Sequence, residues 1–264
     1  MVSNLEHCVS MPDHPIFTAV RAFDVEALRR ELAAGADPDM YQSDFPEYDY
    51  SSASTPLCQA VYWASGCARE RIQERLKCIA VLLEAGASVD KQCSYGETPL
   101  LKAAGVESPT WTVVIAALLE AGADPNFTTT DNGESVLARA ALKGSTGAVR
   151  MLISAGAVDL DRALECTILG GEQHNCTLLL RAGAEIRWRA YDICDSQTLA
   201  YIRRVRATGG FKAYEKAHRQ HLAAIFLAKF PVLPVEMLER VVEFSYNCGG
   251  PSKCPSIAPK YLLD

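Results

Sequence analysis

Leu-Leu-Glu-Ala-Gly-Ala, at Leu82 to Ala87, decides the fold because the chain repeats it. The same six residues return at Leu118 to Ala123, and substituted copies occupy 31–36, 151–157 and 179–184. Each copy is typical of the last turn of a helix that ends at glycine, since glycine adopts a left-handed backbone without a Cβ clash. A motif that recurs at a regular interval indicates a stack of similar structural units.

A second helical segment precedes each copy of the motif. Thr55-Pro-Leu and Thr98-Pro-Leu are typical helix starts, because Thr caps an exposed N–H group and Pro is favoured at the first helical position. The first copy is polar at Arg29, Arg30 and Glu31, which suits the amino-terminal end of a stack. In the second copy, the charged segment 64–75 predicts an extension of one or both helices past the stack.

The pattern divides the chain of 264 residues into four parts. We expect a loose amino-terminal arm at 1–13 and a repeat stack at 14–209, with about five repeats and a degenerate sixth. Helical periodicity then predicts a helical tail at 210–246, and the Gly- and Pro-containing segment 247–264 predicts a flexible terminus.

The repeat resembles that of ankyrin-repeat proteins over about residues 14–185. Thr98-Pro-Leu with Ala103-Ala104, and Gly122-Ala-Asp-Pro-Asn126, match the family pattern best. The resemblance implies an all-α solenoid of helix-turn-helix units, here with a carboxy-terminal helical extension. The histidine that the family carries after Thr-Pro-Leu is replaced, for instance by Cys58 and Leu101, so packing must supply the stability that it usually gives.

Composition excludes several classes of protein. The formal net charge of −6 gives no reason to expect nucleic-acid binding. Apolar runs fall short of the roughly 18–20 residues that a membrane span requires. The ten cysteines form no Cys-x-x-Cys pair and no signal peptide is evident, so we expect reduced thiols in a cytoplasmic or nuclear protein that is not secreted.

No catalytic or cofactor motif is present, and the sequence predicts a protein that is not an enzyme and needs no cofactor. A zinc site formed by His218, His221, Cys248 and Cys254 is conceivable from the ligand types. Their spacing is not that of a zinc finger, and neighbouring Lys216 and Arg219 would repel a cation. We therefore expect no metal.

Partner binding is the expected function, through the concave face and the finger-like turns of the stack. Aromatic residues dominate the binding energy at many interfaces, and the acidic, aromatic loop 40–53 is the most unusual turn. The candidate contacts are Tyr41, Phe45, Tyr48, Tyr50, Trp63, Tyr95, Trp111 and Phe127. For Trp111 a place in the core is an equal alternative. The protein partner cannot be named from these residues.

Two further resemblances concern single segments. Asn126 resembles an asparagine that is hydroxylated in some ankyrin proteins, but a structural role in the turn is preferred. The segment Leu233 to Phe244 resembles the opening of F-box-like segments, and its place after the stack is similar to that of a SOCS box. The sequence thus predicts an interaction scaffold, with a ubiquitin-ligase substrate adaptor as the alternative; a helical pair that seals the stack is preferred for the tail.

Overall fold

A computed structural model describes residues 14–42, 54–62, 71–106, 111–143, 145–170, 172–186 and 197–229. Within these ranges the chain is helical, with isolated bridges but no strands. The first helices of the five pairs are α1 (Pro15–Ala22), α3 (Pro56–Tyr62), α5 (Pro99–Ala104), α7 (Val136–Leu142) and α9 (Leu160–Gly170). The second helices are α2 (Val25–Ala33), α4 (Ile72–Glu84), α6 (Trp111–Glu120), α8 (Thr146–Ser154) and α10 (Gln173–Ala182).

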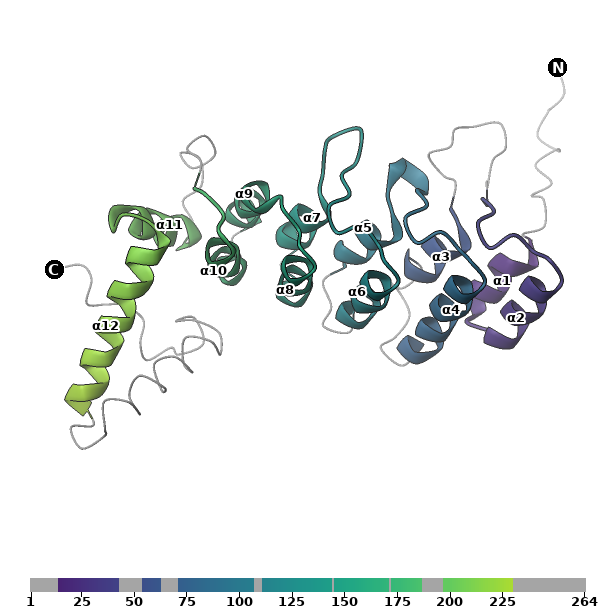
Figure 1. Ribbon diagram of the computed structural model, residues 1–264, viewed down its shortest axis with the longest axis horizontal. Coiled ribbons are helices and arrows are strands. Elements are labelled where there is room, and N and C mark those ends of the chain that lie inside the picture. Colours follow the sequence, from purple (N-terminus) through teal and green to yellow (C-terminus); the bar gives the residue numbers. More distant parts are fainter. Residues whose placement is uncertain are drawn as a thin grey trace, which may run out of the picture.

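The helix pairs stack side by side into an elongated solenoid (Figure 1). First helices pack on first helices from α1 to α9, and second helices pack on second helices from α2 to α10. Turns 87–98 and 123–135 project beside the first helices, and we call them the second and third fingers (Figure 1). The described residues 37–42 and 54, between α2 and α3, belong to what we call the first finger. The all-α solenoid predicted from the sequence is confirmed.

The helix ends have the predicted chemistry. Thr98 Oγ1 accepts a hydrogen bond from Leu101 N at 3.3 Å, and Pro99 occupies the first position of α5. At the other end of a pair, Gly86 has a φ of 90°. This left-handed turn lets Ala87 N donate to Leu82 O at 3.0 Å, which satisfies a carbonyl that the helix leaves unpaired.

Neighbouring repeats are joined by one recurring hydrogen bond. A side chain that follows one helix pair accepts a hydrogen bond from a backbone N–H that follows the next helix pair. This N–H belongs to the second residue after the glycine that ends that next pair. The bonds are Asp39 to Ser88 N (2.9 Å), Asp90 to Asp124 N (3.1 Å) and Asn126 to Val158 N (2.9 Å). A related bond, from Asp161 in the first turn of α9 to Glu185 N after α10, measures 2.7 Å. Because the first three bonds cross repeat boundaries, this ladder fixes the register of the stack.

Asn126 belongs to this ladder, which favours the structural role over the hydroxylation alternative. Its Nδ2 also donates to Gly156 O at 3.3 Å. We expect Asn126→Ala to lower the free energy of unfolding by about 1–2 kcal/mol, since the side chain loses two hydrogen bonds, each with a modest net contribution to stability. Asn126→Asp, which keeps the acceptor, should lose less. Urea unfolding followed by circular dichroism measures both, and equal losses would contradict the role of the acceptor.

Among the buried residues of α4, Arg75 is the charged one; the others are apolar. This helix begins at Ile72, so residues 72–75 of the predicted extension are helical. Arg75 does not lie past the stack, however: it is 3% exposed. Its guanidinium lies 4.6 Å from the ring centroid of Phe23 and 5.4 Å from that of Trp111. At Arg75 the predicted helical extension is therefore packed between neighbouring elements, and residues 63–70 lie outside the described ranges.

The carboxy-terminal helices continue the stack. α11 (Gln197–Ala207) packs on α10, and α12 (Phe211–Lys229) packs on both α10 and α11 (Figure 1). Glu215 forms an ion pair with Arg181 of α10 at 3.3 Å, and Tyr214 meets Tyr201 of α11 edge-on at 5.5 Å between ring centroids. The beginning of the predicted tail is thus packed against the last repeats.

Other expectations for the two ends of the chain fall outside the described residues. These are the arm at 1–13, the F-box-like segment 233–244, the terminus 247–264 and two of the four zinc-ligand candidates, Cys248 and Cys254. His218 stacks on Tyr214 with 5.7 Å between ring centroids. Within the described ranges, no three metal-ligating side chains gather as an ion would require, and no helix is long and apolar enough to cross a membrane.

Candidate functional site

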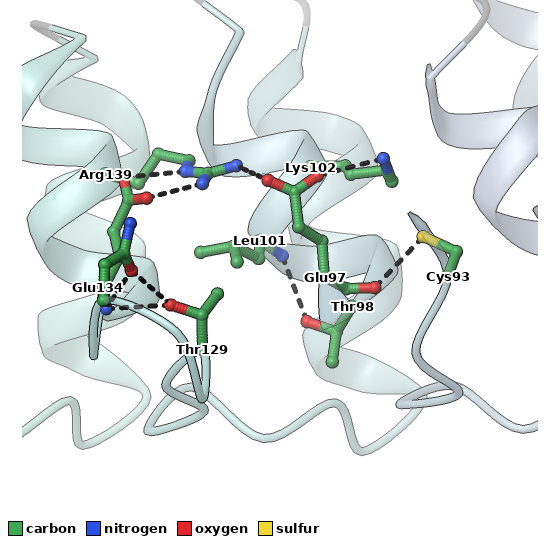
Figure 2. Close-up of polar contacts among 9 residues, drawn as sticks. Cys93, Glu97, Thr98, Leu101, Lys102, Thr129, Glu134 and Arg139 are labelled. Atoms are coloured by element: carbon green, nitrogen blue, oxygen red, sulfur yellow. Dashed lines mark hydrogen bonds and ion pairs between the residues drawn. The ribbon is translucent and has the colours of Figure 1, made fainter. Parts of the chain in front are cut away.

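Four charged side chains form a network between the third and fourth repeats (Figure 2). Glu97 precedes the N-cap of α5, and Glu134 occupies the same place before α7. Arg139 of α7 binds Glu134 through two nitrogens, at 2.6 and 2.9 Å, and extends its third to Glu97 across the repeat boundary. Lys102 of α5 lies 3.0 Å from the other oxygen of Glu97. Two acids and two bases therefore neutralise one another.

The network is largely shielded from water, with side-chain exposures between 8% and 20%. Burial opposes ionisation of Glu97, but hydrogen bonds from Arg139 and Lys102 outweigh it and lower the pKa of this carboxyl. The hydrogen bond from Arg139 lowers the pKa of Glu134. Both carboxylates are therefore ionised at neutral pH and hold the helix starts in place rather than exchanging protons.

The second finger presents an aromatic side chain next to this network. Its tip, Ser94–Gly96, is a tight turn in which Cys93 N donates to Glu97 O at 2.8 Å. Tyr95 has a φ of 61° and is 69% exposed. A left-handed backbone is unfavourable for a bulky aromatic residue, by about 1 kcal/mol or more, so the surrounding turn enforces it. The same turn leaves most of the Tyr95 residue exposed to solvent.

Tyr41 of the first finger leans on the base of the second. Its hydroxyl donates to Gln92 O at 3.0 Å, and Lys91 Nζ lies 4.7 Å from the centre of its ring. The side chain remains 46% exposed. Tyr41 thus lies at the base of the second finger and Tyr95 at its tip. Together with the charged network these two residues form what we call the finger face: Tyr41, Tyr95, Glu97, Lys102, Glu134 and Arg139.

The other predicted contact residues are placed differently. Trp111 begins α6 and is 5% exposed, so of its two alternatives the structure favours the core. Phe127 is half-buried against the same core. Phe45, Tyr48, Tyr50 and Trp63 lie outside the described residues. Of the predicted aromatic contacts that the structure describes, Tyr41 and Tyr95 are the exposed ones.

The charged members of the finger face were missed by the sequence analysis, although a signal existed. Gly-Glu precedes the N-cap residue in both the third and fourth repeats, and a cation follows that cap after four residues, as Lys102 and Arg139. A Glu that recurs at one repeat position, with a base on the adjoining helix, indicates an ion pair between repeats. Which Glu meets which base depends on how neighbouring repeats are spaced.

An open polar hollow lies at the next repeat boundary, where the sequence has no finger. Its volume is about 780 Å³, and Asp159, Asp161, Arg162, Glu165 and Glu185 are among its lining residues. Arg162 also donates to Asn132 O of the third finger at 2.9 Å. The surface beside the network is thus interrupted by a depression with an acidic excess.

Comparison with solved structures finds chains of similar fold. The chain is similar to the ankyrin repeat domain of human ASB11, with 21% sequence identity, over 65% of this chain and 70% of that domain, at a TM-score of 0.49. No family model and no curated protein matches the sequence.

The architecture itself has the features of the ankyrin pattern quoted from the sequence. Helix pairs start at capped Thr-Pro or Ser residues, end at left-handed glycines and are bridged by finger turns, and the pairs stack in register through one repeated hydrogen bond. This combination is what the quoted ankyrin pattern specifies. The described residues therefore form the stack of helix pairs that the resemblance to ankyrin repeats predicts.

Proposed function

We propose that the protein is an interaction module that binds a protein partner through the finger face and performs no chemistry of its own. Stacked repeats form a rigid extended surface, and such surfaces serve recognition. The observation that carries the proposal is Tyr95, an exposed aromatic residue held in a strained backbone at a finger tip. Strain of this kind persists where the displayed side chain is useful.

The surroundings of Tyr95 support binding rather than catalysis. Exposed aromatic rings with few rotatable bonds are common anchors at interfaces, and Tyr41 supplies a second ring beside the same finger. The neighbouring network is internally neutralised and its carboxyl pKa values are lowered, so it offers a rigid, hydrogen-bonding floor. A partner with an apolar pocket for Tyr95 and polar groups for the floor fits this surface.

Replacement of Tyr95 by Asn tests the proposal. Asn tolerates the left-handed backbone, so the finger should keep its shape while the ring is lost. Partners captured by the unmutated chain should bind this variant at least tenfold more weakly, a change of about 1.4 kcal/mol or more. Affinity capture followed by titration of each recovered partner measures the change.

Matched variants separate the ring from general surface effects. Tyr95→Phe keeps the ring and should retain most of the affinity, whereas Val158→Ser alters another exposed side chain and should leave binding unchanged. Serine replacement of the tyrosines at 41, 48 and 50 tests the first finger separately. If Tyr95→Asn binds every partner as tightly as the unmutated chain, the second finger is not the binding site.

The adaptor alternative has a separate test. Because α12 packs on α10 and α11, a deletion that starts at 211 would expose the last repeats and could unfold them. A deletion of residues 230–264 removes the F-box-like segment and spares α12. If the shortened chain no longer binds a ubiquitin-ligase scaffold but still binds its partner at the finger face, the adaptor function is supported. If both kinds of binding are unchanged, the result counts against it.

A further inference from the structure

The tip of the third finger carries a chemically labile pair of residues, Asn132 and Gly133. The sequence contains Asn followed by Gly at this position alone. Because glycine has no side chain, its backbone nitrogen can approach the side-chain amide carbon of the preceding asparagine without steric hindrance. Asn132 is exposed, and Gly133 has a φ of 62° in the turn that closes the finger. The reacting groups are thus adjacent in the chain and close to solvent, so water is the one external reagent that they require.

Hydrogen bonds within the finger hold both reacting groups in place. The N–H of Gly133 donates to Thr129 O at 3.0 Å. The side-chain oxygen of Asn132 accepts from Glu134 N at 2.9 Å and from the Thr129 hydroxyl at 2.5 Å. Figure 2 shows Thr129 beside Glu134, whose N–H also donates to the threonine hydroxyl at 2.9 Å. A buried threonine therefore fixes the exposed pair.

We propose that Asn132 is a deamidation site that the closed third finger protects and that reacts when this finger opens. Gly133 N attacks the side-chain carbonyl carbon of Asn132 and loses its proton, which solvent transfers to the leaving NH2 group. Ammonia departs and a cyclic succinimide forms. Water then opens the ring at either carbonyl to give aspartate or isoaspartate, so one water is consumed for each ammonia released. In the closed finger Thr129 O holds the Gly133 N–H, and the ring cannot form until this bond breaks.

The finger tip has the properties of a segment that opens locally. Residues 128–134 are all polar or glycine, so no apolar side chain anchors the turn. A surface turn that is held by hydrogen bonds alone opens while the packed core stays folded. Arg162 of α9 adds one tie from the next repeat, because it donates to Asn132 O at 2.9 Å.

The products differ from asparagine in charge and in shape. Both add a carboxylate next to Glu134 of the finger face, and isoaspartate also inserts a methylene group into the backbone. The finger that holds Glu134 and contacts Arg162 can then no longer form the same turn. The deamidation itself does not depend on whether the finger face binds a partner.

A peptide map of the full-length chain tests the proposal. The protein is incubated at neutral pH in buffer and, in parallel, in guanidinium chloride, and the peptide that contains Asn132 is followed over time. Its products are heavier because OH replaces NH2, and isoaspartate separates from aspartate by retention. We expect conversion of Asn132 to be at least about tenfold slower in the folded chain, since only molecules with an open finger react. Asn126 and Asn175, which precede Phe127 and Cys176, should stay largely unmodified in both samples.

Variants test whether the hydrogen bonds of the finger give the protection. Thr129→Val removes the buried hydroxyl and should raise the rate in the folded chain several-fold without changing the rate in guanidinium chloride. Arg162→Met removes the tie from an exposed side chain, should act in the same direction, and decides the question if Thr129→Val misfolds. Thr130→Val is the matched control, because the hydroxyl of Thr130 bonds to Asp131 instead, and it should leave the rate unchanged.

Three results would overturn the proposal. Equal rates in buffer and in guanidinium chloride would mean that the closed finger gives no protection. A folded Thr129→Val or Arg162→Met chain that reacts no faster than the unmutated chain would mean that these bonds do not control the reaction. Absence of product from every folded chain would mean that the finger does not open.

Discussion

Replacement of Arg75 by alanine is expected to lower the free energy of unfolding by about 3–4 kcal/mol, the largest effect of any single change considered for this protein. Arg75 Nη1 donates to Ala60 O at 2.7 Å and to Val61 O at 3.4 Å. These carbonyls belong to the last described turn of α3, and carbonyls at a helix end need partners from outside the helix. Without the guanidinium, buried acceptors are left unpaired, contact with the rings of Phe23 and Trp111 is lost, and a cavity remains.

The contribution of the charge can be separated from that of the volume. Arg75→Met fills much of the space but offers no donor, so it should lose about 2 kcal/mol. Arg71→Ala is the matched control, because this arginine also lies over Phe23, at 5.4 Å, but is exposed. An exposed cation over a ring contributes about 0.5–1 kcal/mol. Urea unfolding followed by circular dichroism measures all three, and equal losses for Arg75→Ala and Arg71→Ala would refute the buried role.

Replacement of Arg139 by methionine is expected to cost about 2 kcal/mol of stability at neutral pH. Arg139 joins Glu134 of its own repeat to Glu97 of the preceding one. Its removal leaves Glu134 without its bidentate partner and Glu97 with Lys102 alone in this network. Because the carboxylates are shielded from water, the lost hydrogen bonds are only partly replaced by solvent.

This loss should depend on pH with a defined sign. The pKa values of Glu97 and Glu134 are lowered in the folded protein. Such groups stabilise the fold fully above the ordinary carboxyl pKa, and this stabilisation disappears as pH falls through the lower folded values. The difference between the unmutated chain and Arg139→Met should therefore be largest near neutrality and shrink below about pH 4.

Urea midpoints at several pH values provide the measurement. Lys102→Met is the control within the same network: it removes one ion pair from Glu97 and leaves the Arg139 bridge intact, so its effect at neutral pH should be about half as large. A stability difference for Arg139→Met that is unchanged down to pH 3 would mean that packing, not charge, explains the role of Arg139.

Much of the fold could be predicted because its determinants are local. Thr98, Pro99 and Gly86 act within one helical turn, where cap chemistry and backbone freedom are properties of the residue itself. Exposure of Tyr95 was predicted for the same reason, since a residue at a finger tip has few neighbours. Trp111 could not be assigned, because an aromatic residue at a helix start suits either the surface or the core.

The rest of the candidate site depends on contacts between repeats. Arg139 meets Glu97 only because α5 and α7 pack side by side, and the Cys58 thiol reaches Lys91 O, at 3.9 Å, only because the second finger lies against α3. The recurrence of Gly-Glu in the sequence indicates an ion pair but not which base meets which carboxylate, and no sequence pattern indicates the contact of Cys58. Arg75 is the clearest case, since a charged residue in a charged segment is normally solvated, and its burial follows from the carbonyls and rings that surround it.

The sequence by itself determined the scaffold of this protein: the helix pairs, their glycine ends and the positions of the fingers. These follow from a repeated motif whose conformational preferences act over a few residues. Packing between the repeats decides instead which side chains meet across repeat boundaries, that Trp111 is buried, and where an arginine lies in the interior. Such contacts depend on the distance and register between repeats, and these arise only when the stack is assembled.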